Sequence, residues 1–276
     1  MQHLQHLVRS KPGSEWNFVD LEVRNILVQD VDAATFFGLP NGELPALTAV
    51  SPAVLNVPEI EILQESDMPD SAQISKEDHV FFKYLRRVGL YRFGKEAGND
   101  LIRHVLKMLD FDDGERLITT GREMILEVCG TRVSAKADTD VWDGYAHSLL
   151  VQCEEYSALI NEPNEPLIAA AIAAFSENNY FHLYKPRSLW TFYGIALTGS
   201  APFFYKIPVT EDLVNDVVSG KYPAEPVIVQ RLVPPVQDQR HYHQQGMMPV
   251  ENRRIVFQCL EALRGVLSLH YMIFWF

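Results

Sequence analysis

The stretch LLVQCEEY, residues 149–156, is an apolar run that ends abruptly in a cysteine and two adjacent carboxylates. A strand that is buried on both faces reads as a continuous apolar run, so these residues predict a central strand of a sheet. Two acids at the end of such a strand are either solvated or form the rim of a site. The end of this strand is therefore the first place where we expect functional side chains.

The segment before this run predicts its partner strand. Residues 132–143 alternate in polarity, and Asp143 and Gly144 supply turn chemistry, so an antiparallel hairpin with residues 148–156 is expected. Asp138 and Asp140 are two residues apart on that strand, which places them on one face. Carboxylates gathered at adjacent strand ends repel one another unless a cation or a proton lies between them. Solvated acids at a strand edge remain the alternative.

The rest of the chain predicts a mixed α/β domain with an irregular N-terminal arm. Prolines recur through residues 1–75, which we interpret as the arm, and residues 76–276 form the domain. Apolar spacing and turn residues predict helices at 76–90, 93–110, 165–179, 211–220 and from 249, and strands at 117–129, 132–143, 148–156, 190–199, 202–209 and 226–232.

Composition limits the class of protein. The 276 residues carry 24 Lys and Arg against 36 Asp and Glu, a net charge of −12, which argues against general electrostatic binding of nucleic acid but leaves room for a local basic groove. The three cysteines are scattered and give no disulfide or zinc pattern. No apolar run has the length of a membrane span, and the first residues do not resemble a secretory signal. We expect a cytoplasmic protein with no membrane partner.

The hairpin and the alanine-rich helix after it, PNEPLIAAAIAAFSENN, resemble fungal proteins of the PD-(D/E)XK nuclease-like family. The resemblance covers roughly residues 78–265. It implies a mixed sheet flanked by helices, in which one strand-end acid, an E-x-K on the next strand and a helix Glu bind Mg²⁺ and activate water. On this match Asp140 takes the place of the strand acid and Glu96 that of the helix acid.

This chain departs from that family where the second strand ends. Related sequences have Gln-Glu-Asp-Lys there, and this one has Gln-Cys-Glu-Glu at residues 152–155. Cys153 therefore stands in place of the metal-binding Glu, and Glu155 in place of the lysine that stabilises negative charge during hydrolysis. Lys136, on the neighbouring strand, is the candidate for a relocated lysine. The departure predicts loss of nuclease activity and no metal cofactor, with Mg²⁺ needed only if the nuclease chemistry survives.

In size and scaffold the chain also resembles fungal arginine-containing cyclodipeptide synthases. That resemblance implies a transferase of secondary metabolism that joins arginine to a second amino acid delivered as aminoacyl-tRNA. Its partners would be the tRNA and a small amino-acid substrate. A planar guanidinium would then be bound by carboxylates of the hairpin, which are Asp138, Asp140, Glu154 and Glu155.

Other residues around the predicted cleft have two interpretations each. Cys153 is either a nucleophile or a buried cysteine, and the nearby carboxylates favour the second because they raise the pKa of a thiol. Lys185, Arg187, Trp190 and Tyr193 mix charge with aromatic rings and are expected to bind the substrate or its RNA, although half of such rings belong to a core.

Two further functions stay open. One is a metal-dependent nuclease that uses Glu96, Lys136, Asp140 and Glu154. The other is a catalytically inactive binding protein.

Overall fold

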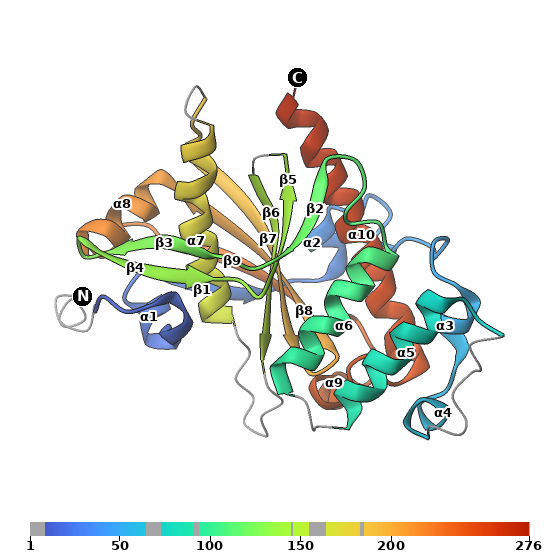
Figure 1. Ribbon diagram of the computed structural model, residues 1–276. Helices are drawn as coiled ribbons and strands as arrows, with labels where there is room; N and C mark the ends of the chain where they lie inside the picture. The colour runs from blue at the N-terminus through green and yellow to red at the C-terminus, as the bar shows by residue number, and fades with distance from the viewer. Residues whose placement is uncertain are drawn as a thin grey trace.

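The computed structural model describes residues 9–64, 73–90, 94–144, 146–154, 164–182 and 185–275, with the side chains of all of these except Ile60 and residues 269–275. Its centre is a mixed sheet with helices on both faces (Figure 1). The helix α7 (Asn164–Phe181) covers one face. The other face is covered by α5 (Lys76–Gly89), α6 (Gly94–Met108) and α10 (Val250–Trp275). The expected α/β class is confirmed.

The main sheet has seven strands in the order β1-β9-β8-β7-β6-β5-β2. In chain order the strands are β1 (Ile26–Asp30), β2 (Arg116–Thr120), β5 (Thr139–Asp143), β6 (Ala146–Glu154), β7 (Leu189–Thr198), β8 (Ala201–Thr210) and β9 (Val227–Leu232). β6 and β7 are parallel, as are β1 and β9, while the other pairs are antiparallel. A parallel pair needs a crossover, and α7 supplies it between β6 and β7.

The predicted hairpin of β5 and β6 is confirmed. Gly144 adopts a φ of 62°, a conformation that favours glycine, and the chain returns from β5 into β6 at this point. The register shifts between Val141 and Trp142, so a β-bulge re-aims the side chains near the turn.

The two strands expected at 117–129 and 132–143 are each split in two. β2 and β5 stay in the main sheet, whereas β3 (Glu123–Val128) and β4 (Thr131–Lys136) leave it as a separate two-stranded ribbon. The fork lies at Gly121, whose N–H donates to the carbonyl of Asp138 at 2.9 Å. A Cβ at Gly121 would lie 1.4 Å from the carbonyl oxygen of Ala137, so only glycine allows the strands to approach this closely.

Helix α7 lies between the main sheet and this ribbon, which explains its composition. It contacts β6 on one side and β3 and β4 on the other. Its buried positions include the consecutive run from Leu167 to Phe175, so it is apolar all around. A helix of this kind must be covered on every side, and the fork provides that cover.

The N-terminal segment is more regular than expected. It forms a 3-10 turn (Gly13–Glu15), the short helices α1 (Phe18–Glu22), α2 (Ala33–Phe37), α3 (Pro52–Asn56) and α4 (Glu59–Leu63), and the edge strand β1 of the main sheet. The buried guanidinium of Arg253 on α10 holds this segment, because it donates to the carbonyls of Val54 and Val57 at 2.8 and 2.9 Å.

The remaining helices agree with their sequence signals, with one exception. Ser75 caps α5, and Thr210 caps α8 (Glu211–Ser219) before Gly220 ends it in the left-handed region. The segment after β9 was expected to be a loop, but it contains α9 (Gln239–Gln245), whose Tyr242 is buried and donates to the carbonyl of Pro202. None of the helices in the described part of the chain has the length and apolar character needed to cross a membrane.

Candidate functional site

The carboxylate of Asp138 is the polar centre at the end of β6. Its Oδ2 atom accepts hydrogen bonds from Nε2 of Gln152 at 2.9 Å and from the backbone N–H of Cys153 at 2.8 Å, and Nζ of Lys95 lies 3.0 Å away. The side chain of Asp138 is 12% exposed and that of Lys95 is 37% exposed. A carboxylate that gathers three donors and stays accessible from solvent can take part in binding or proton transfer.

The fork in the sheet places Asp138. The backbone of this residue connects β4 to β5, and its N–H donates to the carbonyl of Val151 on β6. Its carbonyl accepts from Gly121, so both backbone groups are fixed. Lys95 reaches the carboxylate from the first turn of α6. Asp138, and not Asp140, is therefore the strand acid beside Gln152 and Cys153.

Gln152 and Cys153 differ in what they offer to a ligand. The amide oxygen of Gln152 is buried and has no hydrogen-bond partner among the described residues. The thiol of Cys153 is fully buried, and this burial raises its pKa well above the ordinary value; Asp138 raises the pKa further and Lys95 opposes the shift. A buried thiol with a raised pKa is a poor nucleophile, which agrees with the interpretation of Cys153 as a core residue.

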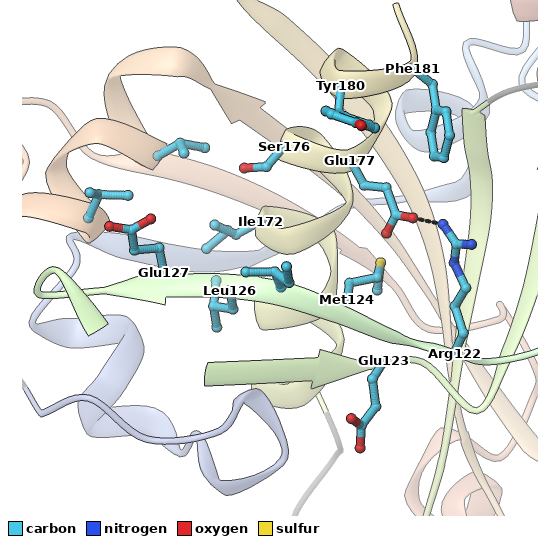
Figure 2. Close-up of a pocket in the computed structure, with 13 residues that line it drawn as sticks. Arg122, Glu123, Met124, Leu126, Glu127, Ile172, Ser176, Glu177, Tyr180 and Phe181 are labelled. Carbon is cyan, nitrogen blue, oxygen red and sulfur yellow. Dashed lines mark ion pairs between the residues drawn. The ribbon is translucent and has the colours of Figure 1, made fainter. Parts of the chain in front are cut away.

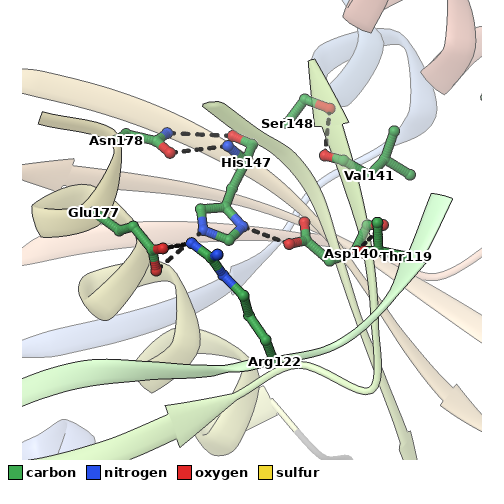
Figure 3. A network of polar contacts seen from close by, with 8 residues as sticks. All are labelled: Thr119, Arg122, Asp140, Val141, His147, Ser148, Glu177 and Asn178. Atoms are coloured by element: carbon green, nitrogen blue, oxygen red, sulfur yellow. Dashed lines mark hydrogen bonds and ion pairs between the residues drawn. The ribbon is translucent and has the colours of Figure 1, made fainter. Parts of the chain in front are cut away.

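Asp140 belongs to a different cluster, which Figure 3 shows in close-up. Its Oδ2 atom lies 2.5 Å from Nδ1 of the buried His147, and Nε2 of His147 lies 3.5 Å from Glu177 on α7. Glu177 also forms an ion pair with Arg122, whose guanidinium lies over the ring of Trp142. The order Asp140, His147, Glu177, Arg122 alternates acid and base from the sheet interior to the surface.

Further contacts hold the ring of His147 in place. The side chain of Asn178 accepts a hydrogen bond from the backbone N–H of His147 at 2.8 Å and donates one to the carbonyl of His147 at 3.3 Å. The ring of Trp142 lies 4.2 Å from the imidazole, centroid to centroid. Because both ring nitrogens face carboxylates, only the doubly protonated ring can donate toward both.

The acidic wall expected on the hairpin does not form among the described residues. Asp138 contacts Lys95 and Asp140 contacts His147, so the two acids have separate partners. Glu154 is partly buried at the end of β6 and is engaged in an interaction, while Glu155 lies outside the described residues.

Two other residues expected in the site, Lys136 and Glu96, are not among the hydrogen-bond or ion-pair partners of Asp138. Lys136 is exposed at the end of β4, opposite Glu123 in the ribbon, and forms no ion pair with a described carboxylate. The lysine beside the strand acid is Lys95 instead. Glu96, the next residue on α6, is exposed.

The residues at this centre do not fit the Mg²⁺ site that the family resemblance implies. Magnesium prefers several oxygen ligands in octahedral geometry. Here one oxygen of Asp138 is saturated by donors, and the buried thiol of Cys153 stands where the family has a carboxylate. Within the described ranges no three His, Cys, Asp or Glu side chains come together as a metal-binding group.

The residues expected to bind substrate lie before β7 and on its first half. β6 and β7 run parallel, with Leu149 opposite Tyr193 and Glu154 opposite Thr198. Lys185 and Arg187 precede β7. Trp190 comes eight residues before Thr198, which is roughly 26 Å along the strand at about 3.3 Å per residue, and Tyr193 lies between them in the middle of β7.

These four residues have structural contacts of their own. Nε1 of Trp190 donates to Asn179 at 2.8 Å, and the guanidinium of Arg187 lies over its ring at 4.5 Å. Tyr193 is buried, which raises its pKa to about 12. The exposed Lys185 donates its backbone N–H to the carbonyl of His182. Their part in substrate binding stays a prediction.

The sequence alone did not indicate roles for Lys95, Gln152, His147, Glu177 or Arg122. In the sequence, Lys95 stands out only because it is next to Glu96, the expected helix acid. Its contact with Asp138 joins residues that are far apart in the chain, at the start of α6 and just before β5. His147 lies at the beginning of the apolar strand. A histidine in a buried run is expected to have a polar partner, but the sequence does not show which residue that partner is. A comparison of the sequence with protein-family models and with curated proteins found no match.

Proposed function

We propose that the chain is a PD-(D/E)XK-like protein that transfers aminoacyl groups from RNA-linked esters, with Lys95 and Asp138 at its centre. The observation that carries the proposal is the 3.0 Å contact between these two side chains at the end of β6. The topology supports the scaffold, because α6, β2, β5, β6, α7 and β7 follow in the order that the resemblance implies, with two antiparallel pairings and one parallel pairing. The fungal and nuclease-like assignment rests on that resemblance.

The chemistry needs an acid–base pair and no metal. The carboxylate of Asp138 accepts a proton from the α-amine of one amino acid, and the amine then attacks the ester carbonyl of a second, aminoacyl-tRNA-borne amino acid. A C–N bond forms, the C–O bond to the ribose breaks, and the proton passes to the leaving hydroxyl. The ammonium of Lys95 donates to the oxygen on which negative charge develops. The first amino acid is itself esterified to tRNA. The amine of the second residue therefore attacks that ester carbonyl in turn, which forms the second C–N bond, breaks the remaining C–O bond to ribose and closes the cyclic dipeptide.

The proposal does not specify arginine as the amino acid. Guanidinium recognition requires a carboxylate that can give both oxygens to the ligand. Asp138 and Asp140 are already engaged with Lys95 and His147. The product assay must therefore search for cyclic dipeptides of every composition.

A second candidate, phosphodiester cleavage, is favoured by one specific observation. Lys95 supplies beside the strand acid the positive charge that the Gln-Cys-Glu-Glu sequence lacks, and the amide oxygen of Gln152 is unpartnered beside it. In this form of the proposal Lys95 would stabilise the charge of the pentacoordinate phosphate.

One set of variants separates the candidates. The purified protein is incubated with total tRNA, synthetases, ATP and all amino acids, and products are identified by mass spectrometry. In parallel, labelled DNA and RNA are incubated with it in Mg²⁺ or Mn²⁺. Lys95→Ala and Asp138→Asn are compared with Lys107→Ala, an exposed lysine on the same helix.

We expect a cyclic dipeptide that disappears on RNase treatment and in both centre variants, with the Lys107→Ala protein unchanged. Cleaved nucleic acid that depends on Lys95 would replace this proposal with the nuclease. Neither activity, with both centre variants folded, would leave a binding protein.

A further inference from the structure

A groove lies along β3, outside the Lys95–Asp138 centre. Its volume is about 560 Å³. One wall is the continuous stretch Arg122–Glu127, and the other wall is formed by the last turns of α7 and by Val214 and Val218 of α8. Figure 2 shows Ser176, Glu177 and Tyr180 on α7 above the open side of β3.

The groove follows the edge of the strand and not one of its faces. Successive side chains of a strand point to opposite faces, so a cavity against one face would touch every second residue. This groove touches six consecutive residues. On β3 the side chains of Met124, Leu126 and Val128 are buried, while Glu123 and Ile125 are exposed.

This edge of β3 has no strand beside it in the described part of the chain. β4 pairs with the opposite edge, from Glu123↔Lys136 to Val128↔Thr131. Apart from that ladder, the first backbone contact after the fork is the N–H of Cys129, which donates to the carbonyl of Val217 on α8. Between the fork and Cys129 the outward N–H and C=O groups of β3 are available, and such an edge can accept a further strand.

The side chains around the edge define what kind of strand fits. A peptide that extends the ribbon would turn alternate residues toward the apolar wall, formed by Ile172, Val214 and Val218. Its other residues would face outward beside Glu123 and Glu127, the cross-strand neighbours on β3. Glu177 is already paired with Arg122, so the unpaired acids of the groove are these two.

We propose that the groove binds an extended peptide that alternates apolar residues with Lys or Arg, as a third strand of the β3–β4 ribbon. Backbone hydrogen bonds to β3 supply affinity, and the alternation supplies selectivity. Glu123–Val128 spans about 20 Å, which corresponds to a bound segment of about six residues. The inference is independent of the function proposed for the Lys95–Asp138 centre.

The test uses the full-length protein and fluorescein-labelled peptides in anisotropy titrations. The probe is acetyl-KVKVKVK-amide, compared with acetyl-EVEVEVE-amide. Two further probes carry N-methyl groups on all valines or on all lysines, because each set removes the N–H groups of one peptide edge. The protein variant is E123K/E127K, and its matched control is E115K, an exposed glutamate outside the groove.

We expect the lysine peptide to bind and the glutamate peptide not to bind, with one of the two methylated peptides losing affinity. The double variant should weaken binding by about tenfold and E115K by less than about twofold, as expected for cross-strand charge pairs. Hydrogen exchange should slow at the amides of residues 123–127 on binding.

Three results would overturn the proposal. The first is equal binding by both methylated peptides, since the backbone edge would then not be used. The second is unchanged exchange in β3. The third is a dimer, seen by sedimentation of the protein alone, that the lysine peptide does not dissociate, because a second copy would then occupy the edge.

Discussion

Nζ of Lys95 lies 3.0 Å from Oδ2 of Asp138, so the first turn of α6 meets the fork where the sheet divides. The same oxygen accepts from Gln152 and from the backbone of Cys153. Asp138 is therefore held by β6 whether or not Lys95 is present, and the lysine can serve a ligand without being needed for the fold.

Lys95→Ala should change stability little. The lysine is partly exposed, and exposed ion pairs contribute about 0–1 kcal/mol. Asp138→Ala leaves the buried Gln152 amide and the Cys153 N–H without an acceptor, which costs about 1–3 kcal/mol for each group. Urea unfolding of both variants should rank Asp138→Ala as the more destabilised. Equal losses would mean that Lys95 is a structural residue.

The three cysteines should react very differently with a thiol reagent. Cys129 is exposed, whereas Cys153 and Cys259 are buried, and burial raises the pKa of both buried thiols. Because the thiolate is the reactive form, the folded protein at pH 8 should modify one equivalent rapidly and three only in denaturant. Mass spectrometry identifies the modified residue. Rapid modification of Cys153 in the folded protein would restore it as a candidate nucleophile.

His147→Ala should be strongly destabilising. It leaves Asp140 as a buried carboxylate without its partner, and removal of one member of a buried pair costs about 3–5 kcal/mol. The exposed pair His241–Asp238 offers a matched control, and His241→Ala should change stability little because exposed ion pairs contribute little. Thermal and urea unfolding give both values, and a similar cost for the two variants would contradict the assigned network.

Two glycines should respond to alanine in opposite directions. Gly121→Ala places a methyl group against the carbonyl of Ala137 and should cost more than about 3 kcal/mol, as expected for backbone overpacking. Gly265 lies exposed within α10, and a Cβ there meets no atom within 4 Å. Gly265→Ala should therefore stabilise by about 0.5–1 kcal/mol. The midpoint of urea unfolding measures both effects, and an unperturbed Gly121→Ala protein would contradict the crossing at the fork.

Arg253→Met should loosen the N-terminal segment. The buried guanidinium donates to four carbonyls, those of Met247, Met248, Val54 and Val57, and burial lowers its pKa to about 10, so it stays charged at neutral pH. Loss of several charge-assisted bonds should cost about 3 kcal/mol or more.

Limited proteolysis should then cut first between residues 45 and 64. Arg254→Met, on the exposed neighbour that contacts Leu55 and Asn56, is the control and should leave the cleavage pattern intact. Identical digestion of both variants would show that Arg253 does not anchor the segment.

The hairpin and α7 could be predicted from local sequence. The apolar run, the Asp-Gly turn and the alanine-rich helix each depend only on residues that are close together in the chain. The edge strand β1 escaped prediction since its five residues have an irregular burial pattern and its partner β9 lies at the other end of the chain. The position of Asp138 beside Gln152 and Cys153 could not be predicted for a different reason. The split of 132–143 changes the partners of Asp138 and Asp140, and only the contact at Gly121 reveals that split.

The fork also has a mechanical consequence. The ribbon is directly connected to Asp138, because only Ala137 separates the end of β4 from this residue. On the other strand, Gly121 is bonded to the Asp138 carbonyl one residue before Arg122 enters the groove. A displacement of the ribbon is therefore transmitted to the backbone of Asp138 through the covalent link at Ala137 and through the hydrogen bond from Gly121. A peptide bound along β3 and the contact between Lys95 and Asp138 are therefore connected through the backbone at the fork.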